Sequence, residues 1–454
     1  MKEKLPKEFL EDMKEILKDE FEDFLKKYEE KPIRSFQINN IKTTNENFLE
    51  IFDKKIEKIP YAPNGYYLKD EMKVGFDPLH HSGSYYMQEP SAMTVTNSVT
   101  IPKDSIVLDV CSAPGGKSIG ISNQLLGSGF LVSNEINPTR AKILLSNIER
   151  MGITNCMVTN FNVNQLKELY PNTFDYIFLD TPCSGEGMFR KDEQAIQEWS
   201  KENVDLCAKR SLELLETIES CLKKDGYLVY STCTFAKEEN EEVIEKFLKK
   251  HHYELIELPD NIQKVTKEGI KTTENTTLTR RFYPHTGNGE GQFIAVLKKK
   301  EETNEKENWK SAIQKLTNQQ EKIVLSFLKE TLTNIDFEIY KYKEQIILLP
   351  KTPIPFPSHH VLSLGVTLGT IEKNRIVPHH QFFSAYGKHF KNKLNLKQND
   401  SRIQKYLEGQ EIESEQINDG WGCLLIEESP VGGFKAKNQK LKNHYPKGLR
   451  NFSN

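Results

Sequence analysis

The chain has 454 residues, 37% of them hydrophobic, which is enough for about three domains with buried cores. Its 62 Lys and Arg against 65 Asp and Glu give a formal net charge of -3, which excludes a uniformly basic coat for nucleic acid but not local basic patches. No apolar run approaches the ~18 residues of a membrane span. The mixed-charge N-terminus lacks a secretory signal core, and seven cysteines without C-x-x-C spacing fit a reducing compartment. A soluble, cytoplasmic protein is expected, with no role in a membrane.

The first expected domain, residues 1–100, opens with a charged amphipathic helix and continues into a polar, aromatic-dotted stretch. The apolar positions of the helix recur at helical spacing and are Leu10, Met13, Ile16, Leu17, Phe21, Phe24, Leu25 and Tyr28. Acids outnumber bases in this helix, so it is a poor surface for phosphate. We therefore expect it to pack against the rest of the protein.

Residues 101–299 alternate between strand and helix patterns. Strands are expected at 106–110, 130–133, 156–159, 176–179, 227–230 and 292–297, and helices at 117–126, 139–151, 204–221 and 238–250. Strand followed by helix, repeated, predicts a parallel sheet that is covered on both faces. The fold class is therefore α/β, with flanking α+β regions.

A charged segment without apolar residues, 300–310, is the expected linker to a C-terminal region, 311–454. That region has strand-like apolar runs and two basic segments. Residues 373–405 carry eight Lys and Arg against one acid, Asp400, and six Lys and Arg without any acid follow Glu428. An acid-free run is unusual in a chain with more acids than bases, so we expect the tail to bind RNA through Lys435, Lys437, Lys440 and Lys442.

The first strand of the sheet runs into a glycine-rich turn and then a helix, a device that brings backbone close to a ligand. A phosphate-binding P-loop is disfavoured because Cys111 occupies its first glycine position, and the dinucleotide pattern G-x-G-x-x-G is absent. S-adenosylmethionine is the remaining cofactor. Its expected ligands in the turn are Cys111, Ser112, Ala113, Pro114, Gly115, Gly116 and Lys117.

An acid at the end of the second strand supports this cofactor. Glu135 lies about 20 residues beyond the glycines, where Rossmann-like folds bind ribose hydroxyls. By itself Glu135 is equally well explained as a surface acid before the next helix. Together with the turn, it is better explained as a ribose ligand.

Two cysteines follow the fourth and fifth strands, each in a polar turn. Cys183 comes after Asp180, and Cys233 ends the next strand. Ligands of open α/β sheets sit at the carboxyl ends of strands, so both thiols are expected in one pocket. A thiol, a carboxyl group and a methyl donor are what methylation of carbon 5 of cytosine requires, because a thiolate must first add to carbon 6. Asp180 is expected to hydrogen-bond the target base and to line the cofactor site.

The strings CSAPGGKS, DTPCSGEGMFRKD and YSTCTFAKEENEEV resemble the motifs of the Sun-family RNA (cytosine-5) methyltransferases, most closely bacterial RsmF-type members that act on 16S ribosomal RNA. The ending VGGFKAKNQKLKNHYPKGLR resembles that subgroup, whose last domain is PUA-like. The resemblance implies a Rossmann-like class I core, an N-terminal RNA-binding domain and a target in the decoding region. It further implies 16S rRNA or the small subunit as partner.

The same resemblance assigns roles by position. It implies that Cys233 is the nucleophile, that Cys183 assists product release, and that Asp180 orients the base. The family usually has an aspartate near the adenine, and here Asn162 takes that place. From the residues alone we add Arg190 and Lys191, just beyond Cys183, as ligands of the flanking phosphate.

Two alternatives remain open. In DNA cytosine methylases the cysteine after proline is the nucleophile, which here would be Cys183. A catalytically inactive RNA-binding assembly factor is the second alternative, although it would have no need for the two cysteines and Asp180. Four His-His pairs lack the spacing that would complete a metal site, so no metal is expected. A monomer is expected.

Overall fold

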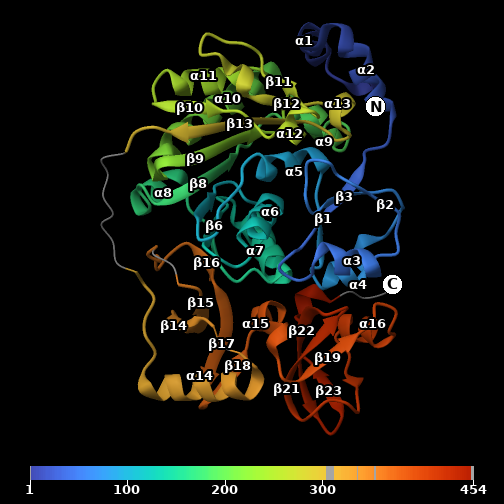
Figure 1. The fold of residues 1–454 in the computed structure, drawn as a ribbon, viewed down its shortest axis with the longest axis vertical. Coiled ribbons are helices and arrows are strands. Elements are labelled where there is room, and N and C mark those ends of the chain that lie inside the picture. The colour runs from blue at the N-terminus through green and yellow to red at the C-terminus, as the bar shows by residue number, and fades with distance from the viewer. Residues whose placement is uncertain (1, 303–310, 335, 352–353, 451–454) are drawn as a thin grey trace.

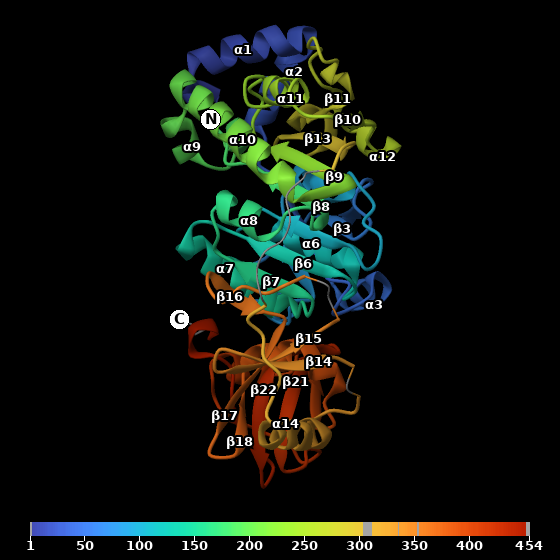
Figure 2. The same cartoon turned by 90° about the vertical axis from the view of Figure 1, so that its left-hand side faces the viewer.

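The structure is a computed structural model that describes residues 2–302, 311–334, 336–351 and 354–450. Figure 2 shows three tiers, with the N-terminal helices at one end, the large sheet in the middle and the C-terminal region at the other end. The expected linker, 300–310, lies outside the described residues from 303 onward. Among the described helices, none is long and apolar enough to cross a lipid bilayer.

The central sheet follows the predicted α/β plan. Its strand order is β11-β12-β13-β9-β8-β5-β6-β7-β16, and β10 pairs with β13. Five neighbouring strands, β9, β8, β5, β6 and β7, are parallel, and β13 is antiparallel to β9. The strands are β5 (Ile106–Asp109), β6 (Phe130–Asn134), β7 (Cys156–Thr159), β8 (Phe174–Asp180), β9 (Leu222–Thr232), β10 (Tyr253–Ile256), β11 (Lys267–Glu268), β12 (Arg280–Phe282), β13 (Gln292–Lys299) and β16 (Val361–Leu364).

Helices cover both faces of this sheet because neighbouring strand residues point to opposite sides. Leu108 packs in a cluster with Leu166 of α8 and Leu215 of α10, whereas Val107 packs with Leu144 of α7 on the other face. The predicted double covering is confirmed. The helices of this part are α5 (Pro90–Asn97), α6 (Gly116–Leu125), α7 (Pro138–Met151), α8 (Val163–Leu169), α9 (Glu193–Glu198), α10 (Lys201–Ile218), α11 (Glu241–Leu248), α12 (Asp260–Gln263) and α13 (Pro284–Gly287).

The first hundred residues form two separate parts of the structure, a pair of helices and a small sheet. Helices α1 (Lys7–Leu17) and α2 (Phe21–Lys26) pack on the part that contains the central sheet, where Phe9 contacts Phe189 and Phe24 contacts Phe235 edge-on. A separate four-stranded sheet lies lower in Figure 1, next to α6 and α7. Its elements are β1 (Arg34–Ile38), β2 (Ile56–Lys58), β3 (Gly65–Leu68), β4 (Tyr85–Met87), α3 (Asn45–Ile51) and α4 (Pro78–His81). The packing role predicted for the first helix agrees with its contacts.

The C-terminal region contains two further sheets. The first has the order β14-β15-β17-β18 and the second β19-β21-β22-β23-β20. Their elements are α14 (Asn318–Thr331), β14 (Glu338–Tyr342), β15 (Gln345–Leu349), β17 (Val366–Glu372), β18 (Arg375–Pro378), α15 (His380–Tyr386), β19 (Lys393–Leu396), α16 (Arg402–Leu407), β20 (Ile412–Glu413), β21 (Gly420–Ile426), β22 (Ser429–Lys437) and β23 (Lys440–Asn443).

One strand of the C-terminal region belongs to the central sheet. β16 pairs antiparallel with β7, with Val361 opposite Thr159 and Leu364 opposite Met157. It covers the backbone groups that the edge strand β7 would otherwise expose. The boundary predicted at 300–310 therefore does not separate the sheets, because strand pairing between distant segments is not visible in local patterns.

A buried lysine links the first sheet to the last one. Lys42 Nζ donates to Ser82 O and Pro430 O, both at 2.7 Å, and to Ser384 Oγ at 3.0 Å. Burial lowers the pKa of Lys42 well below its usual value, and every acceptor is neutral. Apolar side chains of both sheets form one shared cluster around this contact. The C-terminal region is therefore anchored to the N-terminal sheet as well as to the central one.

Candidate active site

The glycine-rich turn between β5 and α6 is held in one backbone conformation by its neighbours. Arg140 Nη2 donates to Ala113 O at 2.8 Å, and Asn147 Nδ2 donates to Pro114 O at 2.9 Å. Gly115 has a φ of 120°, a conformation that other residues rarely adopt. Both carbonyls are thus engaged by side chains of α7. The turn from Cys111 to Lys117 is therefore a rigid cradle at the start of α6.

Two buried carboxylates beside this cradle each keep one oxygen that accepts no hydrogen bond, and Glu135 Oε2 lies 3.6 Å from Arg140 Nη2 in an ion pair. Asp109 Oδ2 accepts from Ser118 Oγ at 2.6 Å, and Glu135 Oε1 accepts from Asn137 N at 2.9 Å. Asp109 Oδ1 and Glu135 Oε2 have no hydrogen-bond partner. Burial raises the pKa of Asp109 to about 6. Unpaired buried acceptors are costly, so this site is built for a ligand that brings hydroxyl or amino donors.

Asp180 lies at the end of β8 in a set of polar contacts that joins the cradle to the next strand. Lys117 Nζ lies 2.6 Å from Asp180 Oδ2, and Ser231 Oγ donates to Asp180 Oδ1 at 2.6 Å. Gln292 Nε2 of β13 donates to the same oxygen at 3.3 Å. Burial by itself lowers the pKa of Lys117, but the charge of Asp180 outweighs it and leaves the pKa raised. Asp180 thus lies next to a fixed cation.

The two predicted cysteines meet. Cys183 Sγ and Cys233 Sγ are 3.1 Å apart, both thiols are free, and both residues are partly exposed. β8 and β9 are parallel neighbours, as predicted, so their carboxyl ends bring the two turns together. The hydrogen bond to Cys233 and then burial raise the pKa of Cys183 well above its usual value. A proton shared by the pair therefore stays on Cys183.

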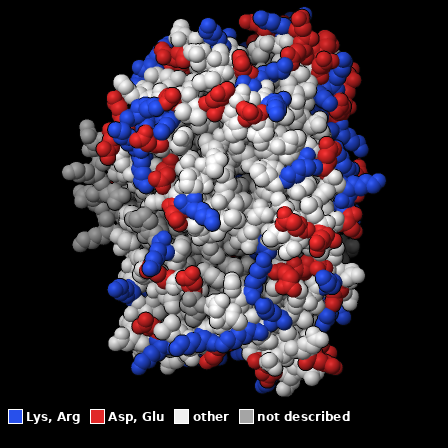
Figure 3. All heavy atoms as spheres, in the orientation of Figure 1, with Lys and Arg blue, Asp and Glu red and all other residues white. Residues whose placement is uncertain are grey.

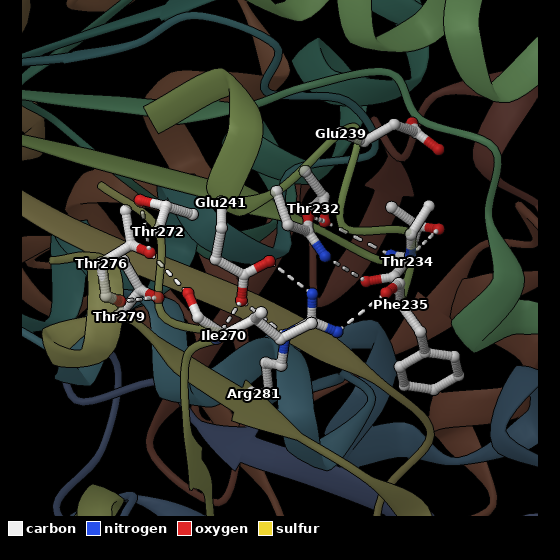
Figure 4. A network of polar contacts seen from close by, with 12 residues as sticks. Thr232, Thr234, Phe235, Glu239, Glu241, Ile270, Thr272, Thr276, Thr279 and Arg281 are labelled. Atoms are coloured by element: carbon white, nitrogen blue, oxygen red, sulfur yellow. Dashed lines mark hydrogen bonds and ion pairs between the residues drawn. The ribbon is translucent and has the colours of Figure 1, made fainter. Parts of the chain in front are cut away.

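The turn that carries Cys233 is fixed on both sides by buried side chains, shown in Figure 4. Thr232 Oγ1 donates to Asn240 Oδ1 at 2.6 Å, and Asn240 Nδ2 donates to Thr234 O at 3.0 Å. Gly187 N donates to Cys233 O at 2.9 Å, and a side chain at Gly187 would approach that oxygen to 2.8 Å. The position of the sulfur is therefore set by α11, β9 and the turn after β8.

A buried ion pair also holds this turn in place. Arg281 Nε donates to Glu241 Oε1 at 2.6 Å, and its Nη2 pairs with Glu241 Oε2. Arg281 Nη1 donates to Phe235 O at 2.8 Å, two residues beyond Cys233. On the other side, Glu186 Oε2 accepts from Phe235 N at 2.9 Å. Both backbone groups of Phe235 are thus held by charged side chains.

Two residues predicted for binding are placed differently. Arg190 is 5% exposed and forms an ion pair with Glu290 at 3.2 Å, so its guanidinium does not face a phosphate in this conformation. Asn162 is exposed, and its Oδ1 accepts from Gln165 N at 3.0 Å as the N-cap of α8. That bond occupies the oxygen expected at the adenine. Sequence position alone did not show these local partners. Lys191 is exposed, and its Nζ lies 3.8 Å from Glu290 Oε1.

The four lysines predicted to bind RNA lie on the hairpin of β22 and β23, in the last sheet. They are exposed, and Figure 1 shows this sheet at the lower end of the molecule, below the central sheet that contains β8 and β9. The structure does not bring them to the cysteines. In the part of the chain that is described, no group of three or more His, Cys, Asp or Glu is placed to hold a metal ion.

Several supporting residues were missed by sequence reasoning. Ser231, Asn240 and Glu241 lie within a string quoted for the resemblance, and Arg281 lies outside those strings. The partners of Ser231 and Glu241 are 51 and 40 residues away in the chain. The one local signal was the pair of adjacent arginines before the turn-rich segment 284–291, which precedes β13. A charged pair between otherwise buried strands indicates a buried partner.

The sheet order, the cradle and the polar strand ends define a Rossmann-like methyltransferase. A solved structure described as a methyltransferase homologue from Pyrococcus horikoshii has a TM-score of 0.55 and 26% identity and covers 62% of this chain and 91% of its own. The structure of NSun6 from Pyrococcus horikoshii with SFG has the same fold, with a TM-score of 0.55 at 20% identity over 65% of this chain and 99% of its own.

Family models divide the chain into three matched parts. The model described as 16S rRNA methyltransferase RsmB/F matches residues 98–298, the N-terminal domain of 16S rRNA methyltransferase RsmF matches 5–90, and the methyltransferase RsmF PUA domain matches 392–451. The chain therefore belongs to the RsmB/F family of 16S rRNA methyltransferases, and the protein is an enzyme.

Relatives match the chain almost from end to end. The ribosomal RNA small subunit methyltransferase F of Psychromonas ingrahamii is 29% identical over 478 residues, covering 99% of this chain and 98% of its own. That of Vibrio vulnificus is 29% identical over 472 residues, covering 98% of this chain and 97% of its own. The predicted family is confirmed.

Proposed function

We propose that this protein methylates carbon 5 of a cytosine in 16S rRNA, with S-adenosylmethionine as donor. The observation that carries the proposal is the 3.1 Å separation of Cys183 Sγ and Cys233 Sγ at neighbouring strand ends, beside Asp180. In this assignment residues 101–299 are catalytic, and residues 1–100 and 311–454 contact RNA. The decoding region is the proposed target, and the proposed location is the cytoplasm.

The donor site rests on the cradle and the two unpaired acceptors. Cys111 to Lys117 would hold the methionine part, and Glu135 would accept from the ribose hydroxyls. S-adenosylmethionine carries hydroxyl and ammonium donors, which fit the oxygens of Asp109 and Glu135 that accept no hydrogen bond. When bound, it supplies an electrophilic methyl group. Asn162 is left out of the acceptors for adenine because its oxygen caps α8.

Cys233 is the proposed nucleophile. Its thiolate adds to carbon 6 of the cytosine, which breaks aromaticity and makes carbon 5 nucleophilic. The pKa of Cys183, which is raised by its hydrogen bond to Cys233 and by burial, favours the neutral thiol at Cys183 during this addition. Asp180 hydrogen-bonds the exocyclic amine and ring nitrogen 3 and stabilises the charge that develops on addition.

Release of product needs removal of the proton on carbon 5. Cys183 first passes its own proton to solvent, and its thiolate then accepts the carbon-5 proton because its sulfur lies next to that of Cys233. The electrons of the broken C–H bond re-form the ring double bond, and the bond between carbon 6 and Cys233 breaks. Cys233 returns as a thiolate. The cytosine must leave its stack to reach this site, which favours a loop or an exposed helix of the RNA.

The test of the proposed function is transfer of tritiated methyl groups from S-adenosylmethionine to small-subunit rRNA that lacks the modification. We expect incorporation, with bisulfite sequencing showing a newly protected cytosine. Comparison with rRNA from a deletion strain locates the position. If the protein binds this RNA but transfers no methyl group, it is the inactive assembly factor instead.

Glu135→Gln is expected to weaken binding of S-adenosylmethionine by about 10- to 150-fold, because a buried acceptor of the ligand loses its charge. Isothermal titration measures the affinity in the absence of RNA. Glu168→Gln is the matched control, since it removes an exposed carboxylate of nearby α8 and should leave the affinity unchanged. Equal affinities for the two variants would contradict the ribose-binding role.

A further inference from the structure

A wide groove of about 1100 Å³ lies between α14, β18 and the last sheet, far from the cysteines. One wall comes from α14 and β18, which fall between the segments matched by the family models, and the other from β21 to β23 within the matched PUA domain. Figure 1 shows α14, β18 and β21 at the lower end of the molecule, below the central sheet that contains β8 and β9. It is separate from the proposed active site.

The groove is basic. Its lining includes five cations and two acids, and the cations are Lys322, Arg375, Lys391, Lys435 and Lys442. Figure 3 shows Lys and Arg side chains in a row across the lower part of the face, in the region of α14. All five are exposed, and none forms an ion pair with a described residue. In a protein with more acids than bases, unneutralised cations at one place indicate an anionic partner.

The hairpin of β22 and β23 adds a second indication. Lys435 lies directly opposite Lys442, and Lys437 lies directly opposite Lys440. Like charges directly opposite on a strand pair are destabilising. The four lysines also line a second hollow of about 740 Å³ that adjoins the groove. A bound anion that neutralises both pairs would offset this repulsion.

An aromatic side chain lies on the floor between these cations. Trp421 is half-buried, Lys435 Nζ is 5.3 Å from its ring centroid, and the His444 ring is 4.5 Å away, edge-on. Grooves that bind unpaired nucleic acid combine cations along the backbone path with aromatic rings on which bases stack. A duplex offers its phosphates but no free base faces.

We propose that this groove binds an unpaired segment of the RNA, with Trp421 against a base and the lysine pairs on its phosphates. The identity of that RNA as rRNA rests on the proposed function, whereas binding itself does not. Because the groove is remote from Cys233, it holds a different part of the RNA from the target cytosine. It therefore sets affinity for the substrate and not the rate of the chemical step.

The test measures binding of a labelled single-stranded RNA of about 12 nucleotides, and of the same sequence as a duplex, to the full chain without donor. Trp421→Ala is expected to weaken single-strand binding by about 5- to 150-fold. Lys435→Ala with Lys442→Ala is expected to weaken it and to lower the slope of log affinity against log salt by about 1.4, or about 0.7 for each phosphate that is no longer neutralised. In methyl transfer, both variants should raise KM for rRNA and leave kcat unchanged.

Lys224→Ala with Lys271→Ala is the matched control, because it removes the same charge from exposed positions of residues 101–299, outside the groove. If the groove pair binds RNA as well as this control, the proposal is wrong. Equal loss of duplex binding in Trp421→Ala would overturn the choice of an unpaired strand. If Trp421→Ala does not fold, the proposal is tested by Lys435→Ala with Lys442→Ala alone. Absence of methyl transfer in every sample would remove the proposed function but not a binding difference.

Discussion

Cys233→Ala is expected to abolish methyl transfer and to lose the covalent adduct with RNA that contains 5-fluorocytosine. Fluorine at carbon 5 cannot leave as a proton does, so an enzyme that has added its thiolate stays attached to the RNA. Without the sulfur of Cys233 no bond to carbon 6 forms. The rate should fall by at least about four orders of magnitude, the scale of loss when a covalent nucleophile is removed. A denaturing gel shows the adduct.

Cys183→Ala provides the contrast. This variant should still form the adduct, and with ordinary cytosine it should accumulate attached RNA because release of product is slowed. Cys207→Ala, a buried thiol of α10 outside the pair, should behave as the unaltered protein. An adduct in Cys233→Ala together with none in Cys183→Ala would reverse the two roles and support the scheme of the DNA enzymes.

Arg281→Met is expected to lower the free energy of unfolding by about 3–5 kcal/mol, the second large effect. Arg281 and Glu241 are 2% and 1% exposed, so the variant leaves a buried carboxylate without its partner. It also removes the donor to Phe235 O, which holds the turn of Cys233. Urea unfolding measures the stability, and adduct formation by the folded fraction should be slower.

Two variants separate the ion pair from general damage. Arg281→Met with Glu241→Met removes both charges and should recover part of the lost stability, because no unpaired charge remains. Arg280→Met alters the neighbouring residue of β12, which donates only to neutral oxygens of Thr266 and Gln263, and should cost less. A double variant no more stable than Arg281→Met would contradict the account of the buried charge.

The central part of the fold was accessible from the sequence because its signals are local. Each strand of the parallel core is a short apolar run, and all except β7 are followed by a predicted helix, so β5 to β9 were expected within a few residues of their bounds, whereas α8 after β7 was not predicted. The meeting of Cys183 and Cys233 followed from one general property of such sheets, that neighbouring strands end on one side.

What the sequence did not show depends on partners far along the chain. In the sequence, Arg190 resembles a free cation, but in the structure it pairs with Glu290, which lies a hundred residues further along the chain. Asn162 likewise resembles a ligand, but its side-chain oxygen accepts a hydrogen bond from the backbone N–H of Gln165. The first hundred residues form two parts, the helices α1 and α2 and the sheet of β1 to β4, and which surfaces these parts cover depends on the packing of their apolar faces. Such choices are settled by packing, which periodicity alone does not encode.

The pairing of β16 with β7 has a consequence for how the protein is made. The ribosome completes Thr159 roughly 200 residues before it begins Val361, so the margin of the growing sheet is bare throughout the synthesis of β8, β9 and β13. An uncovered strand margin invites pairing with other chains. The newborn polypeptide therefore needs protection until its last third emerges, and a fragment that stops after β13 would be prone to aggregate even though it holds every residue of the proposed reaction centre.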